Sequence, residues 1–398
     1  MASAVKKMRV EDVENYDKRR FCMAILGLCV ADAYNTQITL TPLKITNCNA
    51  ASSGGACFSK AFCDTESFDE GMVLGDVFQT GIKTLKNFAK NGTLPEERRM
   101  FLAFDKLLNF LNGEKSIRFN SPQNLHALPE TELAELVANH LLGKLAISSC
   151  FLVDKNCTGK RDGCCCGVRS CRMTGEYGDT SIGNSEVWHG NLDIIINNDD
   201  LAVEAIENSL DSPGEKSAVE VKAYLQRNPK IIAQTIVFSF LQEKRHPERE
   251  HFLTPCIGIG NSELIILFYD TEHDVLLESS RVPLFESPVS CKFSYSSILA
   301  CWLVVNYKIF CSGLVEEFKI CKSNFFSHAR EKINIYKDEL KFQNVNSFQS
   351  NEPKLVKVAS KVKTTPLMHE TEKTMLEVLL SLASTDAYSN SAPGSNSN

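Results

Sequence analysis

The N-terminal third of the chain carries apolar residues at helical spacing. In residues 76–91 and 95–111 they recur every three or four positions, which is typical of helices with one buried face. Residues 47–63 are instead rich in serine, glycine and cysteine and show no such period. We therefore expect residues 1–120 to form a helical N-terminal region interrupted by an irregular loop.

The pattern changes near residue 129. Residues 129–145 predict an amphipathic helix, because five apolar side chains share one face at steps of three and four: Leu133, Leu136, Val137, Leu141 and Leu145. Residues 150–184 are rich in glycine, cysteine, aspartate and arginine. We expect this stretch to be a long loop or a small insertion rather than a core element.

Short apolar runs bounded by turn residues follow and predict strands. Residues 186–197 form the first and residues 217–225 the second, while residues 202–211 between them stay undecided. Pro229 suits the first position of a helix that runs to about residue 244. The pattern then predicts three further strands, at residues 257–260, 264–270 and 275–279.

The order of these elements predicts an α/β fold with a mixed central sheet flanked by helices, between residues 125 and 285. After it, residues 293–313 indicate a buried helix and residues 316–344 a more polar one, so residues 286–345 form a helical C-terminal extension. Residues 384–398 are poor in hydrophobic residues, and we expect a disordered tail.

Composition narrows the class of protein. The 398 residues carry a net charge of −6, so a nucleic-acid binder would need a local basic region. The charged N-terminus lacks the apolar segment of a secretory signal, and no apolar run reaches the length of a membrane span. We expect an intracellular protein, nuclear or cytoplasmic, whose sixteen cysteines are mostly free thiols. The oligomeric state is not predicted.

Charged residues interrupt two of the predicted strands. Asp193 lies in the apolar run of residues 186–197, where a carboxylate without a partner is costly. Glu220 and Lys222 lie two positions apart on the next strand, ~7 Å apart on one face. Two acids and a lysine on adjacent strands suit Mg²⁺ or Mn²⁺ and a metal-bound water. The alternative is an aspartate that caps a turn and an exposed charge pair.

The same residues resemble the PD-(D/E)xK nuclease superfamily, in particular its RecB-like branch. The resemblance covers about residues 130–270. It rests on the order and spacing of four short motifs: Gly190-Asn191-Leu192-Asp193, Glu220-Val221-Lys222, Gln234 and Phe238. The proline that precedes the family's aspartate is missing, and Phe238 replaces a tyrosine of that branch.

The resemblance implies a restriction-endonuclease-like core and a metal-dependent nuclease that hydrolyses phosphodiester bonds of DNA or RNA. Asp193 and Glu220 would bind the metal, and Lys222 would contact the attacking water. Gln234, on an otherwise apolar helical face, would position the substrate or the lysine. An inactive member of the same fold that serves as an interaction module is the first alternative.

A further metal ligand is expected from the helix at residues 129–145. At ~100° per residue, His140 falls within the apolar stripe and Glu135 on the opposite side. His140 is therefore the better candidate for a third ligand beside Asp193 and Glu220. A histidine satisfied within the core is the alternative.

Cysteines are concentrated just before the predicted site. Thiolates at this density bind Zn²⁺ or an iron–sulfur cluster, although the spacing matches no standard motif. A cysteine-rich loop without metal is the third possibility, and basic residues of the same stretch are candidates for phosphate contacts. Zinc here would favour another function, a cysteine-rich zinc-binding adaptor. The cluster consists of Cys157, Cys164, Cys165, Cys166 and Cys171.

Overall fold

The computed structural model describes most of the chain. The residues described are 16–30, 37–113, 115–118, 128–157, 163–196, 201–205, 228–260, 262–287, 290–345, 361–363 and 365–389.

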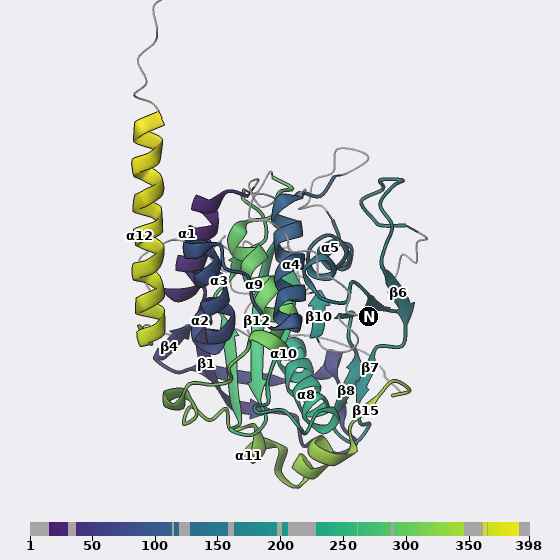
Figure 1. The fold of residues 1–398 in the computed structure, drawn as a ribbon. Coiled ribbons are helices and arrows are strands. Elements are labelled where there is room, and N and C mark those ends of the chain that lie inside the picture. The colour runs from purple at the N-terminus through teal and green to yellow at the C-terminus, as the bar shows by residue number, and fades with distance from the viewer. Residues whose placement is uncertain are drawn as a thin grey trace, which may run out of the picture.

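One large sheet runs through the described residues (Figure 1). Its strands are β1 Thr39–Cys48, β3 Cys63–Ser67, β4 Glu70–Val73, β5 Phe151–Asp154, β6 Gly175–Gly178, β9 Ile194–Ile196, β10 Leu201–Ala205, β11 Leu253–Gly260, β12 Glu263–Asp270, β13 Val275–Ser279, β14 Val282–Pro283 and β16 Lys361–Lys363. They follow the order β16-β4-β1-β13-β12-β11-β10-β9-β5-β6, with β3 beside β1 and β14 beside β12. The pairs β16–β4, β10–β11 and β5–β6 are parallel and the others antiparallel, so the expected mixed sheet is confirmed.

A second, smaller sheet lies beside the large one. It contains β2 Ala56–Cys57, β7 Ser181–Gly183, β8 Trp188–Asn191 and β15 Lys341–Phe342, in the order β15-β7-β8-β2. β7 and β8 are close neighbours in sequence, whereas β2 and β15 come from distant parts of the chain.

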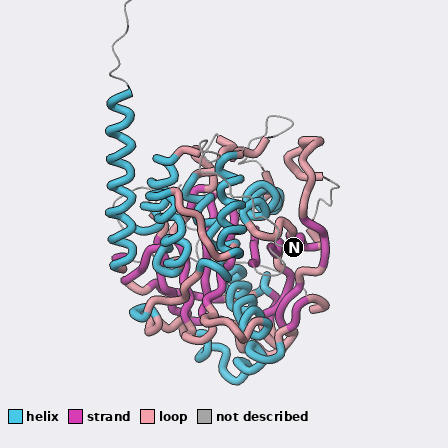
Figure 2. The backbone as a smooth tube through the Cα atoms, in the orientation of Figure 1, coloured by secondary structure: helices cyan, strands magenta, loops and turns pink. Residues whose placement is uncertain are grey.

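Helices cover the sheets on both sides (Figure 2). The longer ones are α1 Lys18–Cys29, α3 Gln79–Asn91, α4 Arg98–Asn112, α5 Glu130–Val137, α8 Pro229–Arg245, α9 Tyr295–Val305 and α12 Pro366–Ser389. Shorter ones are α2 Leu74–Val77, η2 Phe58–Lys60, the π-helical η4 Ala138–Leu142, α6 Gly143–Leu145, α10 Tyr307–Phe310, η5 Glu316–Phe318, α11 Phe325–Ala329, η6 Arg330–Lys332 and η7 Ile335–Glu339. The helices expected at residues 76–91, 95–111, 129–145 and 229–244 are confirmed.

Strand alternation divides the core into two layers. In β12, Ile266 and Phe268 pack into a core shared with α1, α3, α4, α5 and α9. Ile265 and Leu267 point the other way, into a core shared with α8, α11 and η7. Because both faces of β12 are buried, its sequence is apolar almost throughout.

Two expectations about the first half of the chain are wrong. Residues 1–120 are not only helical: β1 pairs with β13, where Leu43 lies opposite Leu276, and carries the sheet into this region. Residues 150–184 are not only an insertion, since β5 pairs with β9 in the large sheet and Val153 is fully buried. Both strands are stabilised by partners far away in sequence, which local periodicity does not reveal.

The strand expected at residues 186–197 is also interrupted. Its first part, β8, belongs to the small sheet and its second part, β9, to the large one. Gly190 has φ 146°, and Leu192 leaves both ladders to exchange hydrogen bonds with Thr180, whose Oγ1 donates to the Leu192 carbonyl at 2.6 Å. Asp193 therefore lies at the junction of the two sheets rather than within one continuous strand.

The C-terminal helix α12 packs against α1 and α3 and extends beyond the body of the protein at its C-terminal end (Figure 1). Met368, Thr371 and Met375 are buried on its inner side, whereas Leu380 is 72% exposed. The helix continues to Ser389, into the stretch from residue 384 where the sequence predicts a disordered tail. The last nine residues lie outside the part of the chain that the structure describes.

We expect Tyr336→Phe to lower the free energy of unfolding by about 1–3 kcal/mol. The Tyr336 hydroxyl, fully buried, donates to the Ala50 carbonyl at 3.0 Å and accepts from the Trp188 amide at 3.2 Å. The variant leaves both backbone groups without this partner while keeping the ring. Urea denaturation measures the difference, and an unchanged midpoint would contradict this account of how β8 is held.

Candidate functional site

Asp193 is the one predicted acid of the active site that lies within the described residues. Its neighbours Leu192 and Ile194 are buried, whereas Asp193 is partly exposed. The Asp193 carbonyl accepts a hydrogen bond from the Asp154 amide at 2.9 Å. The Asp154 carboxylate in turn accepts from the Asn191 side chain at 2.8 Å. A second acid, missed by the sequence analysis, thus lies next to the Asp193 segment.

Gln234 lies in the middle of α8 and is fully buried. Ile231, Phe238 and Leu241 are buried on the same helix, as the pattern predicts. The Gln234 Nε2 donates to the Asn191 carbonyl at 3.4 Å, two residues before Asp193. The structure therefore brings Gln234 and the Asp193 segment together, although they are more than forty residues apart in sequence.

Glu220 and Lys222 lie outside the described residues, so their predicted roles stay predictions. In the large sheet, β10 lies between β9 and β11. It falls at the start of residues 202–211, whose secondary structure the sequence left undecided. The chain carries the same three residues, Ala-Val-Glu, at positions 202–204 within β10 and at positions 218–220. Local sequence thus offers two similar candidates for the position beside β9.

The predicted third ligand, His140, lies in the π-helical segment η4. Its Nε2 is 3.2 Å from the Cys164 Sγ and 3.6 Å from the Cys171 Sγ. Glu135, assigned to the outward side of this helix, is buried, with 8% of its surface exposed. The structure therefore places His140 against the cysteine cluster.

Four side chains of this region could hold a metal ion. The ligand atoms of His140, Cys164, Cys166 and Cys171 all lie within 4.8 Å of one another. Cys165, between two members, is not part of this group: its Sγ contacts the Glu132 carbonyl at 3.5 Å, and its thiol also forms a hydrogen bond with Cys164. Of the expected cysteines, three therefore join a histidine from a neighbouring helix, and two, Cys157 and Cys165, lie outside the set.

Two tight turns bring the three cysteine sulfurs to the same side of their segment. The Gly167 amide donates to the Cys164 carbonyl at 3.1 Å, and Gly167 has φ 73°, which favours glycine. The Cys171 amide donates to the Val168 carbonyl at 2.9 Å, forming a second turn. These turns bring three cysteines of an eight-residue segment to one side, facing η4.

Neighbouring groups make one of the thiols acidic. A hydrogen bond from Cys165 lowers the pKa of Cys164 to about 3, against the effect of burial and with a further contribution from His140. Burial and the nearby Cys164 raise the pKa of Cys171 to about 12. Its neighbours therefore lower the pKa of Cys164, which favours the thiolate, the form in which cysteine binds metals.

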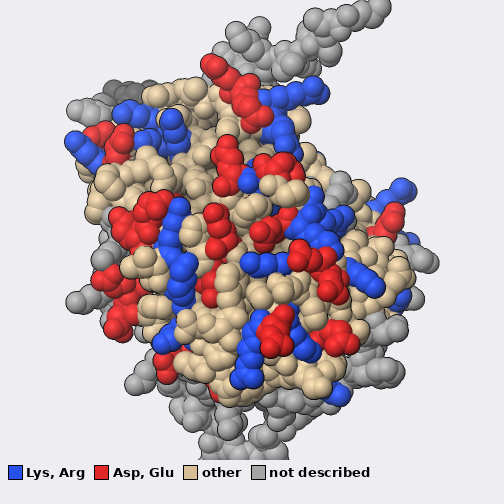
Figure 3. Space-filling model, turned by 90° about the horizontal axis from the view of Figure 1, so that it is seen from below, with Lys and Arg blue, Asp and Glu red and all other residues tan. Residues whose placement is uncertain are grey.

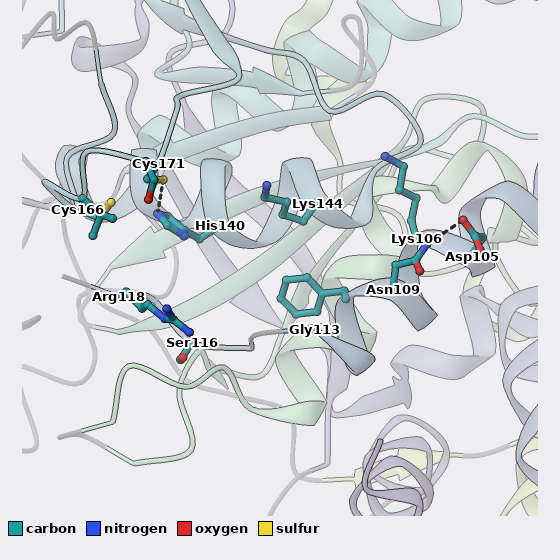
Figure 4. Close-up of a pocket in the computed structure, with 13 residues that line it drawn as sticks. Asp105, Lys106, Asn109, Gly113, Ser116, Arg118, His140, Lys144, Cys166 and Cys171 are labelled. Carbon is teal, nitrogen blue, oxygen red and sulfur yellow. Dashed lines mark hydrogen bonds between the residues drawn. The ribbon is translucent and has the colours of Figure 1, made fainter. Parts of the chain in front are cut away.

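The cluster opens onto a cavity of about 630 Å³ (Figure 4). His140, Cys166 and Cys171 line one end together with Arg118, and Lys144, Lys106 and Asp105 line the rest. On the face seen from below, by contrast, acidic and basic side chains are interspersed (Figure 3). The cavity is a local concentration of positive charge of the kind that phosphate recognition would need.

Comparisons with known proteins identify no relative of this chain. No protein-family model matches the chain, and no curated protein or solved structure matches it significantly. Within the described residues, no helix is both long and apolar enough to span a bilayer.

Proposed function

We propose that the chain is a metal-dependent nuclease with a restriction-endonuclease-like core. The observation that carries the proposal is the contact between Gln234 and the Asn191 carbonyl. It places the buried Gln234 amide of α8 next to the segment that carries Asp193, so two of the residues that carry the resemblance lie close together. The antiparallel pair β9–β10 and the parallel pair β10–β11 provide a suitable scaffold.

The chemistry assigns a different task to each residue. Asp193 and Glu220 would hold Mg²⁺ or Mn²⁺, since both ions prefer carboxylate oxygens. When bound, such an ion lowers the pKa of a water and neutralises charge on a phosphate. Lys222 orients the attacking water through its ammonium group. Gln234, held by the backbone before Asp193, keeps that segment in place against α8.

The partner would be DNA or RNA. The purified full-length chain is incubated with single- and double-stranded DNA and RNA in Mg²⁺ or Mn²⁺, with and without EDTA. We expect cleavage of at least one substrate that EDTA abolishes. Asp193→Asn should slow it by about tenfold or more, equivalent to about 1.4 kcal/mol of barrier, because a neutral amide binds the ion less strongly.

Asp69→Asn is the matched control, because this exposed aspartate lies in the turn between β3 and β4. It should cleave at the wild-type rate. Absence of cleavage with every substrate and both ions would overturn the proposal. Retained nucleic-acid binding in that case would favour the inactive interaction module. Equal rates for Asp193→Asn and Asp69→Asn would remove Asp193 from the site.

A further inference from the structure

We propose that His140, Cys164, Cys166 and Cys171 form a structural zinc centre, which fastens residues 163–174 to the helix formed by α5 and η4. The proposal is independent of the nuclease assignment. It rests on side chains that lie entirely within the described residues.

The distances suit one tetrahedral ion. With Zn–S near 2.3 Å and Zn–N near 2.1 Å, tetrahedral ligand atoms lie about 3.6–3.8 Å apart. His140 Nε2 lies 3.2 Å and 3.6 Å from the sulfurs of Cys164 and Cys171, and no pair in the group exceeds 4.8 Å. Small side-chain rotations would therefore complete the geometry without moving the backbone.

The donor set selects the metal. Three thiolates and an imidazole are the ligands of Cys₃His zinc sites, and four protein ligands leave no open position for catalysis. An iron–sulfur cluster spreads its cysteine sulfurs around several irons and sulfides, so they lie farther apart than in a single-ion site. Mg²⁺ prefers oxygen ligands, and the group contains none.

A second layer of contacts orients the ligands. Asn139, beside His140, is buried, and its Nδ2 lies 3.6 Å from the Cys171 Sγ. Its Oδ1 accepts from the Thr174 amide at 3.1 Å, so one side chain links η4 to Cys171 and to the residues that follow it. Such outer contacts are typical of metal sites. The π-helical turn of η4 is a further feature often found at functional sites.

The cavity provides the route by which the ion enters. His140, Cys166 and Cys171 lie together at one end of it, with Lys106 and Asp105 at the other (Figure 4). Cys164 is buried, so the ion would reach it from the cavity side. A bound ion would hold the cysteine segment in place, and that segment forms one wall of the cavity.

Metal analysis of the full-length chain tests the proposal. We expect about one zinc ion per wild-type chain, as for a Cys₃His site, and a loss of most of it in His140→Ala and Cys171→Ser. Cys150→Ser is the matched control, because it replaces an exposed cysteine outside the group, and it should keep the zinc. Wild-type protein without zinc, or equal losses in all three variants, would overturn the proposal.

A second measurement needs only the wild-type protein, so it does not depend on whether the variants fold. After zinc is exchanged for Co²⁺, we expect a thiolate-to-cobalt charge-transfer band and the intense visible bands of tetrahedral cobalt. Weak octahedral bands would overturn the assignment. Stoichiometric iron with inorganic sulfide in the purified protein would overturn it in favour of an iron–sulfur cluster.

Discussion

Replacing Lys222 with alanine should lower the rate of metal-dependent phosphodiester hydrolysis by roughly 10²-fold, the usual cost of misplacing a reacting group. The proposed role of Lys222 is to hold the attacking water in line, and no smaller side chain can do so. The loss should appear mainly in kcat, because the lysine acts on the water rather than on substrate affinity. Single-turnover cleavage with saturating Mg²⁺ measures it.

Lys90→Ala is the control for this lysine, since Lys90 is exposed at the end of α3. It should leave both the rate and the fold unchanged. If Lys222→Ala cleaves as fast as Lys90→Ala, Lys222 has no part in the reaction. Circular dichroism of each variant separates a lost function from a lost fold.

The repeated Ala-Val-Glu allows a second test of the same site. Glu220→Gln should weaken activation by Mg²⁺, whereas Glu204→Gln should not, because only Glu220 is followed two residues later by a lysine. Titration of the cleavage rate with Mg²⁺ compares the two. A weakened response in Glu204→Gln alone would transfer the role of metal ligand from Glu220 to Glu204.

Removal of the proposed zinc should have the second large effect. At a free zinc concentration about a thousandfold above Kd, linkage predicts a stabilisation of about 4 kcal/mol, which a chelator would abolish. Urea denaturation with and without a zinc chelator measures the difference. Hydrogen exchange should then rise first in residues 163–174 and in η4, which the ion joins.

The Cys171→Ser variant provides the control for chelation, because it already lacks one ligand of the proposed centre. Its free energy of unfolding should not respond to the chelator. An equal response in Cys171→Ser and wild type would mean that chelation acts elsewhere in the molecule. No response in zinc-loaded wild type would show that the ion contributes nothing to stability.

Much of the fold follows from local patterns. The apolar runs of β11, β12 and β13 and the proline that begins α8 are enough to predict these elements. Gln234 is visible in the sequence as a polar residue on an apolar helical face, and the structure confirms that it is buried there. Such features depend on each segment's own periodicity, which survives whatever the segment packs against.

Non-local pairing explains what the sequence missed. β1 forms its ladder with β13, and β5 forms its ladder with β9, so neither strand carries a complete signal in its own residues. The break between β8 and β9 depends on Gly190 and on Thr180, which binds Leu192 from another part of the chain. Local alternation could not place that break.

By itself, the sequence determined the α/β class, the helix that carries Gln234 and the presence of a dense group of cysteines. The tertiary structure alone decided which cysteines lie close together and that His140 lies beside them. The physical reason is that a ligand set is defined by distances of a few ångström. Those distances arise from turns and helix packing between segments more than twenty residues apart, which no spacing along the chain records.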